Sequence, residues 1–130
     1  MNGCYLHDLT KVTWTDAKLF CESRNAHLVE IESKDKSDWL AGTFLLKDTC
    51  PSNIYDICVA WTGGNDLVIE GHYQWNNAPG AMNFTNWYPD EPSIGYPGKA
   101  AARDCIDLLK NGQWNDRKCS FLNPFICEMT

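Results

Sequence analysis

The sequence predicts a small α+β domain stapled by disulfides, and three features of its 130 residues support this prediction. Two segments in the first half show helical spacing of apolar residues behind a capping residue. Later segments are short and strand-like, and glycine, proline and asparagine separate them. Seven cysteines in a chain of this length are typical of a disulfide framework. The length suits one domain over residues 1–130, with a buried core of its own.

The two predicted helices lie within residues 13–26 and 33–47. Thr13 is positioned to cap the first helix, with Asp16 three residues later as in a variant of the capping box. Its apolar face comprises Trp14, Ala17, Phe20 and Cys21. Ser33 is positioned to cap the second helix in the same way. Both apolar stripes are expected to be ordinary core.

Short runs of apolar and β-branched residues predict strands elsewhere in the chain. They lie at residues 4–8, 27–31, 59–64, 73–75, 105–109 and 125–129. Residues 76–103 hold most of the prolines and no predicted element. A long stretch of this kind in a compact domain is usually functional or disordered. Its tryptophan and the cysteine just after it favour a functional loop.

Charge and composition exclude several classes of function. The formal net charge of −6 disfavours nucleic acid and anionic membranes as partners. No apolar run is long enough to span a bilayer, and the start of the chain lacks a signal-like segment. Neither a supported Ser-His-Asp arrangement nor a phosphate-binding glycine loop is present, so an enzyme is not expected. The three histidines lack close metal-ligand spacing and are expected to be structural or solvated; they are His7, His27 and His72.

The cysteines and one short motif point to the extracellular space. The cysteine spacings do not repeat the paired pattern of zinc sites, so an oxidising compartment with disulfides is expected. Asn83-Phe84-Thr85 is an acceptor triplet for N-glycosylation. Both observations agree with a secreted protein.

Two short motifs in the second half stand within a regular cysteine framework. Glu91-Pro92 lies in the long loop, and Trp114-Asn115-Asp116 follows downstream. Cys105 lies nine residues before Trp114, Asp116 lies three before Cys119, and Cys119 lies eight before Cys127. The run AWTGG occupies residues 60–64. Together these segments resemble the C-type lectin-like domain over essentially the whole chain, with Thr62 in place of the family's usual isoleucine.

The resemblance implies a disulfide pattern. It pairs Cys21 with Cys127, Cys105 with Cys119, and Cys50 with Cys58 as an additional local bridge. Cys4 is left over, because its usual partner in the family lies upstream. A free thiol at Cys4 or a bridge to a second copy of the chain is therefore expected.

The resemblance also implies a principal calcium site. Its ligands would be Glu91, Ser93, Asn115 and Asp116, which offer carboxylate, hydroxyl and amide oxygens of the kind that Ca²⁺ prefers. Two neighbouring hydroxyls of a sugar would complete the coordination shell. In the family, the bond before the proline corresponding to Pro92 is typically cis, which turns the flanking side chains toward one point.

Two positions depart from the family pattern at this site. Glu91 matches the mannose-type motif, but Ser93 replaces the usual asparagine and lacks the reach of an amide. Arg103 replaces a calcium-binding glutamate. At about 8 Å and an effective dielectric constant of about 20, its repulsion of a divalent ion would be ~4 kcal/mol. Arg103 could instead grip a carboxylate or sulfate, which makes acidic glycans a minor alternative.

A weak auxiliary calcium site is expected as well. Asp66, Glu70 and Asp104 match family positions for a second ion. Ile94 stands where a further acid is expected, and Arg103 replaces the glutamate that the two sites share. We therefore expect this second site to be empty or weak.

The leading hypothesis is calcium-dependent carbohydrate binding, with mannose-type glycans on microbes or cell surfaces as ligands in innate immune recognition. The alternative is a calcium-independent module that keeps the fold and binds protein or another ligand that is not a sugar. The change at Arg103 is the main sequence feature that favours the alternative. A homodimer through Cys4 is a further expectation.

Overall fold

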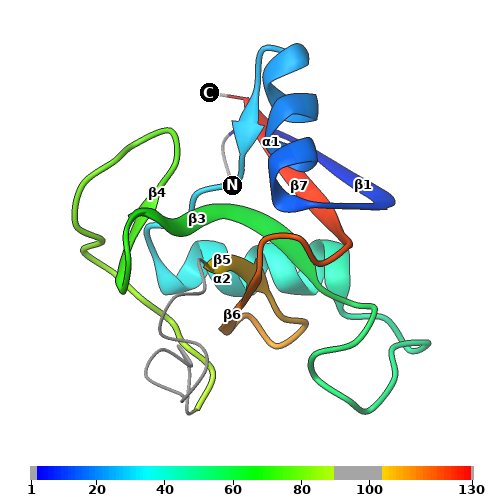
Figure 1. Ribbon diagram of the computed structural model, residues 1–130. Coiled ribbons are helices and arrows are strands. Elements are labelled where there is room, and N and C mark those ends of the chain that lie inside the picture. Colours follow the sequence, from blue (N-terminus) through cyan, green and yellow to red (C-terminus); the bar gives the residue numbers. More distant parts are fainter. Residues whose placement is uncertain (1–2, 90–103, 130) are drawn as a thin grey trace.

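The computed structural model describes residues 3–89 and 104–129. Its helical elements are α1 (Trp14–Ser23), α2 (Lys34–Leu40) and a π-helical continuation, η1 (Ala41–Leu45). Its strands are β1 (Cys4–Val12), β2 (His27–Leu28), β3 (Ala60–Ile69), β4 (His72–Trp75), β5 (Asp104–Leu108), β6 (Trp114–Lys118) and β7 (Asn123–Met129). The predicted α+β fold class with two helices is confirmed (Figure 1).

The described strands join in one twisted sheet rather than in several small ones. Its central order is β1-β7-β3-β5-β6, while β2 pairs with β7 and β4 pairs with β3. Every pairing is antiparallel except that of β3 with β7. The pairing of Cys4 with Met129 brings the two ends of the described chain together. The sheet is therefore mixed, because β3 and β7 meet as neighbours in the parallel sense.

The predicted helix caps are confirmed. The backbone NH of Asp16 donates to Oγ1 of Thr13 at 3.2 Å, and that of Lys36 donates to Oγ of Ser33 at 3.2 Å. Each cap provides an acceptor for an NH group that lacks an intrahelical partner. The second helix was predicted as one unbroken element, but it changes to π-helical hydrogen bonding at Ala41 and ends at Leu45.

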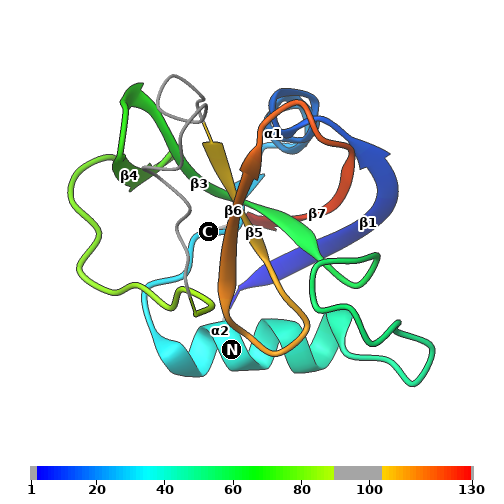
Figure 2. The same ribbon diagram turned by 60° about the horizontal axis from the view of Figure 1, so that its bottom comes forward.

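Two apolar clusters fill the two faces of the sheet, and alternation along the strands separates them. Phe125 of β7 packs with α1, while its neighbour Ile126 packs with α2 and η1. In β3, Trp61 belongs to the cluster with α1, and its neighbour Ala60 belongs to the cluster with α2 and η1. Figure 2 shows α1 and α2 at opposite sides of the strands. Of the tryptophans expected in the core, Trp61 and Trp114 are fully buried and Trp87 is half-buried.

Three disulfides cross-link the fold. They are Cys21–Cys127, Cys50–Cys58 and Cys105–Cys119, the pairs that the resemblance implies. The first joins α1 to β7, the second closes the loop before β3, and the third ties β5 to the residue after β6. Cys4 is an exposed free thiol at the start of β1.

Four strands differ clearly from the prediction. β1 continues to Val12 and β3 to Ile69, beyond their predicted ends at residues 8 and 64. Residues 27–31 were predicted as a strand, yet β2 comprises only His27 and Leu28, and Val29 continues the contact through one bond to the Ile126 carbonyl at 2.9 Å. β6 was not predicted, because its buried face is largely polar and so lacks an apolar alternation. In the described part of the chain, neither helix has the length and apolarity needed to cross a membrane.

Candidate functional site

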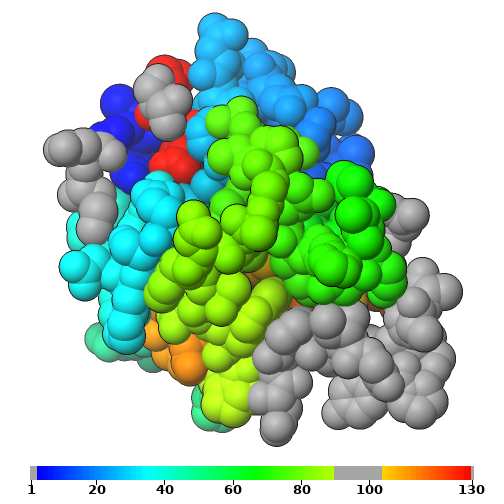
Figure 3. Space-filling view, turned by 90° about the vertical axis from the view of Figure 1, so that its left-hand side faces the viewer, coloured from blue at the N-terminus to red at the C-terminus, as the bar shows by residue number. Residues whose placement is uncertain are grey.

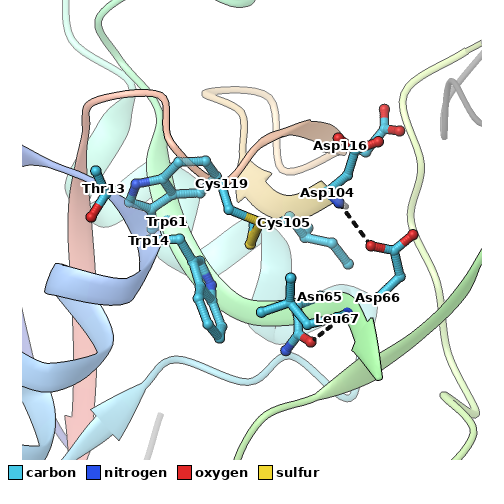
Figure 4. Close-up of a disulfide and its surroundings, with 12 residues drawn as sticks. Thr13, Trp14, Trp61, Asn65, Asp66, Leu67, Asp104, Cys105, Asp116 and Cys119 are labelled. Atoms are coloured by element: carbon cyan, nitrogen blue, oxygen red, sulfur yellow. Dashed lines mark hydrogen bonds between the residues drawn. A yellow bond between two sulfur atoms is a disulfide. The ribbon is translucent and has the colours of Figure 1, made fainter. Parts of the chain in front are cut away.

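Three buried aspartates converge where β3, β5 and β6 meet. Asp66, Asp104 and Asp116 are 0%, 1% and 3% exposed. The backbone NH of Asp104 donates to Oδ1 of Asp66 at 2.7 Å, which joins β3 to β5 (Figure 4). The Gly71 NH donates to Oδ2 of the same carboxylate at 3.0 Å. The Asp66 carboxylate thus connects the turn after β3 to the first residue of β5.

Sheet register brings these acids together. Asp116 lies opposite Ile106 in the β5–β6 pair, and Asp104 lies two residues before Ile106. Residues two apart on a strand share a face, so Asp104 and Asp116 project to the same side. Figure 4 shows both carboxylates beside that of Asp66, next to the Cys105–Cys119 disulfide. The disulfide anchors the two strands that carry two of the three acids.

Tyr73 of β4 contacts this cluster, and the negative charges of the cluster affect its pKa. Its hydroxyl donates to Oδ2 of Asp116 at 3.3 Å. Burial raises the pKa of Tyr73 well above its ordinary value, and the negative charges of Asp116, Asp66 and Asp104 raise it further. Three carboxylates therefore act on one half-buried phenol. Concentrated negative charge in a buried setting is costly unless a cation or donors balance it.

The side chain of Asn115 faces the opposite way from Asp116. It lies beside Asp107, its partner across the β5–β6 pair, and its amide helps to lower the pKa of that carboxyl. Asp107 is fully buried and also accepts from Nε of Arg117 at 2.7 Å and from Nδ2 of Asn123 at 3.0 Å. Burial raises the pKa of Asp107, while the Arg117 guanidinium opposes that shift. The structure thus separates the two predicted ligands of the Trp114-Asn115-Asp116 motif onto two faces of β6.

The remaining predicted site residues are divided between the described and undescribed parts of the chain. Glu70 is exposed in the turn between β3 and β4. Glu91, Ser93 and Arg103 lie outside the described residues. Of the predicted principal ligands the structure therefore describes Asn115 and Asp116, and of the auxiliary ligands it describes Asp66, Glu70 and Asp104.

The described carboxylates are of the chemical type that binds calcium, but they do not form a complete calcium site by themselves. Carboxylate oxygens are the ligands that Ca²⁺ prefers, and three buried carboxylates face one region here. Within residues 3–89 and 104–129, however, no group of three or more His, Cys, Asp or Glu side chains is arranged to hold a metal ion. A complete shell would need oxygens from residues 90–103, where Glu91 and Ser93 lie.

The segment that leads into residues 90–103 is fixed to the body of the domain. Trp114 donates its backbone NH to the Asn86 carbonyl, and Tyr88 donates to the Trp114 carbonyl, both at 2.8 Å. The Asn86 side chain donates to the Gly112 carbonyl at 2.7 Å. At its start, the Asn77 NH donates to the buried Glu30 carboxylate at 2.6 Å. Residues 76–89 lack regular secondary structure but are held in one conformation by these bonds.

A groove of about 500 Å³ lies beside the aspartate cluster, between β4 and residues 80–87. Tyr73 and Trp87 line it with their rings 5.0 Å apart between centroids. Its polar lining includes His72 and Gln74. Figure 3 looks onto this face, where green residues of β4 and the following loop occupy the middle of the surface. Tyr73 belongs to both the groove and the carboxylate cluster.

Sequence reasoning missed Tyr73, Asp107 and the groove. Residues 73–75 were interpreted only as a strand, and Asp107 lay inside a predicted strand without a role. The charged Asp107 in the otherwise apolar run CIDLL was the one available signal, since a buried acid requires a partner.

The comparison with protein families identifies one domain model. The C-type lectin domain model matches residues 10–129 of this chain. Among curated proteins, perlucin from Haliotis laevigata is 30% identical over 129 residues, which cover 97% of this chain and 76% of perlucin. Asialoglycoprotein receptor 2 from Mus musculus is 29% identical over 129 residues. This chain spans only 38% of that receptor's length.

Solved structures agree with the family match. The carbohydrate-recognition domain of the mouse scavenger receptor C-type lectin has a TM-score of 0.80 and 30% identity, covering 98% of this chain and 90% of the other. An SPL-1–GlcNAc complex has a TM-score of 0.75 and 31% identity, with coverages of 97% and 86%.

A more distant structure shares the fold alone. A calcium-independent type II antifreeze protein has a TM-score of 0.74 at 19% identity, covering all of this chain and 89% of the other. On the family model and the close relatives, the chain belongs to the C-type lectin domain family.

Proposed function

We propose that this domain binds glycans in a calcium-dependent manner, with mannose-type sugars as the ligand class. Glu91, Ser93, Asn115 and Asp116 would hold the principal ion, which when bound offers vacant coordination positions to two sugar hydroxyls. For Asn115 this requires a side-chain rotation away from Asp107. Asp66, Glu70 and Asp104 would form a weaker second site.

The observation that supports this proposal is the buried aspartate cluster. Asp104 directly follows the segment that carries Glu91 and Ser93, and its NH is bonded to Asp66. Asp116 shares the same face. Three carboxylates that lie buried on one side of the sheet offer oxygen ligands of the type that Ca²⁺ prefers. Relatives seen with GlcNAc and with a GlcNAc2Man3 oligosaccharide support glycans as the ligand.

Calorimetric titration of CaCl₂ into the protein tests the metal step without any assumption about the sugar. Asp116→Asn should abolish the heat, while the exposed Asp48→Asn, a matched change far from the cluster, should leave it intact. Retention on a mannose column and elution by a chelator then test the sugar step. No heat and no thermal shift at millimolar calcium would contradict the proposal.

A calcium-independent binding module is the second candidate, and Arg103 is the feature that favours it. A guanidinium in place of a ligand carboxylate removes one negative charge and adds a positive one next to the ion. Arg103→Glu distinguishes the candidates. Much tighter calcium binding in the variant would show that Arg103 weakens calcium binding at the principal site. No calcium binding in either protein would favour the second candidate.

Arg103 also makes acidic glycans an alternative ligand class to mannose-type sugars. Its guanidinium offers a bidentate donor pair to a carboxylate or sulfate. Measuring the affinities of wild type and Arg103→Glu for mannose and for a sulfated sugar distinguishes the two ligand classes. Only binding of the sulfated sugar should depend on the Arg103 guanidinium.

The setting of the domain follows from its cysteines. Three disulfides are typical of an oxidising, extracellular compartment, where innate immune glycan recognition takes place. Weak single sites gain avidity from several copies, so a homodimer bridged at the exposed Cys4 is part of the proposal. Mass determination with and without reductant tests that bridge.

A further inference from the structure

Asn83 occupies a distinctive position in the loop beside the groove. Asn83-Phe84-Thr85 is the only Asn-X-Ser/Thr triplet with X other than proline in the sequence. Phe84 is half-buried and packs on Trp114 with ring centroids 5.7 Å apart. Asn83 and Thr85 on either side of it are exposed. The anchoring of Phe84 therefore presents both recognition residues of the triplet to solvent.

The same residues border the groove. Met82 and Thr85, immediately before and two after Asn83, both line it. Its volume of about 500 Å³ falls within the roughly 300–1,000 Å³ typical of small-molecule sites. Tyr73 and Trp87 supply aromatic surface, which suits the apolar faces of sugar rings, and His72 and Gln74 supply hydrogen-bonding groups. Anything attached to Asn83 starts at the rim of this groove.

We propose that Asn83 carries an N-linked glycan whose innermost sugars lie in this groove, against Tyr73 and Trp87. The proposal uses the extracellular compartment proposed above but not calcium or mannose binding. The groove is then filled by the chain's own sugar, so that a glycan from another source would have to bind elsewhere on the domain.

The modification is a group transfer without oxidation or reduction. The Asn83 amide nitrogen forms a bond to the anomeric carbon of a lipid-diphosphate-linked oligosaccharide. The bond from that carbon to the diphosphate oxygen breaks, the lipid diphosphate leaves, and the amide gives up one proton to a base of the host transferase. Thr85 supplies the hydroxyl that the transferase requires of the triplet.

Expression in a eukaryotic secretory host tests the attachment. Intact mass before and after peptide N-glycosidase should show one glycan on wild type, none on Asn83→Gln or Thr85→Ala, and one on the matched variant Thr85→Ser. A secreted wild-type protein with unmodified Asn83 would overturn the proposal. Enzymatic deglycosylation provides a sugar-free protein that folded with its glycan and carries aspartate at position 83, so poor folding of a variant does not obscure the result.

Methionine oxidation tests where the sugar lies. Met82 lines the groove, whereas Met129 is 45% exposed at the far end of β7 and serves as an internal control. Dilute peroxide should oxidise Met82 several-fold more slowly in the glycosylated protein than in the deglycosylated one, with Met129 unchanged. Equal rates at Met82 would show that the glycan extends into solvent and leaves the groove open. Calcium titration of both forms keeps this outcome separate from the metal proposal.

Discussion

The two ends of the sheet bury different kinds of side chain. Around α1, the core consists of apolar residues and the Cys21–Cys127 disulfide, with Trp14 donating its indole NH to the Thr62 carbonyl at 2.7 Å. The buried acid of β7, Glu128, is paired with Lys36 at 2.9 Å. Around β5 and β6, four aspartates are almost completely buried; they are Asp66, Asp104, Asp107 and Asp116. Burying carboxylates generally lowers stability, so the second end has the composition of a binding site. The first end has the composition of a scaffold.

The scaffold end should lose the most stability when its disulfide is removed. On the chain-entropy model, replacing both Cys21 and Cys127 by alanine removes about 4–5 kcal/mol, since 106 residues separate them. The same change at Cys50 and Cys58, only 8 apart, should remove about 2–3 kcal/mol. Urea unfolding measures both. Equal losses would show that loop length does not set the stabilisation in this domain.

Breaking the buried ion pair at the binding end should be the next largest effect. Arg117→Met leaves Asp107 buried without its cation, which should cost about 3–5 kcal/mol. The exposed Lys18–Glu22 pair is the matched comparison, and Lys18→Met should cost at most about 1 kcal/mol.

The loss in Arg117→Met should depend on pH. Burial already raises the pKa of Asp107 in the folded protein, and removal of the guanidinium raises it further. A raised folded-state pKa means that the folded state binds the proton more tightly than the unfolded state does. Stability therefore falls as pH increases from the ordinary carboxyl range to the folded-state pKa. The loss relative to wild type should be smaller near about pH 4 than near about pH 8, and a loss independent of pH would argue against an uncompensated carboxylate.

Neutralising one acid of the cluster should separate stability from binding. Without calcium, Asp116→Asn should raise the free energy of unfolding by about 0.5–2 kcal/mol, because it removes one of three buried negative charges on one side of the sheet. With calcium at about one hundred times its dissociation constant, wild type should gain about 2.7 kcal/mol and the variant nothing. Thermal unfolding with calcium and with chelator measures both effects. A destabilised variant in chelator would mean that the cluster is structural.

The smallest effect is expected at a helix cap on the scaffold end. Thr13→Ala removes the acceptor for the Asp16 NH and should cost about 1 kcal/mol. Calcium binding should not change, because α1 contributes none of the clustered acids. Thr13→Ser keeps the hydroxyl and should retain most of the stability. A change in calcium affinity would show that the two ends are coupled.

Local signals in the sequence were sufficient for the scaffold end. Thr13 and Ser33 were predicted as caps and act as caps, since a cap depends only on residues within one turn. Apolar runs predicted most of the strands for a similar reason. β6 was not predicted because its buried residues Asn115 and Asp116 are polar. Strand prediction relied on alternating apolar residues, and this segment has no such alternation.

The sequence by itself determined the family, the two capped helices and the residue types of the predicted calcium site. Only the tertiary structure decided which acids meet, that Asn115 faces Asp107 while Asp116 faces Tyr73, and that Asn83 borders a groove. The physical reason is that caps and motifs depend on short-range spacing along the chain. Contacts among carboxylates depend instead on strand register, which pairs residues far apart in sequence and turns neighbours to opposite faces.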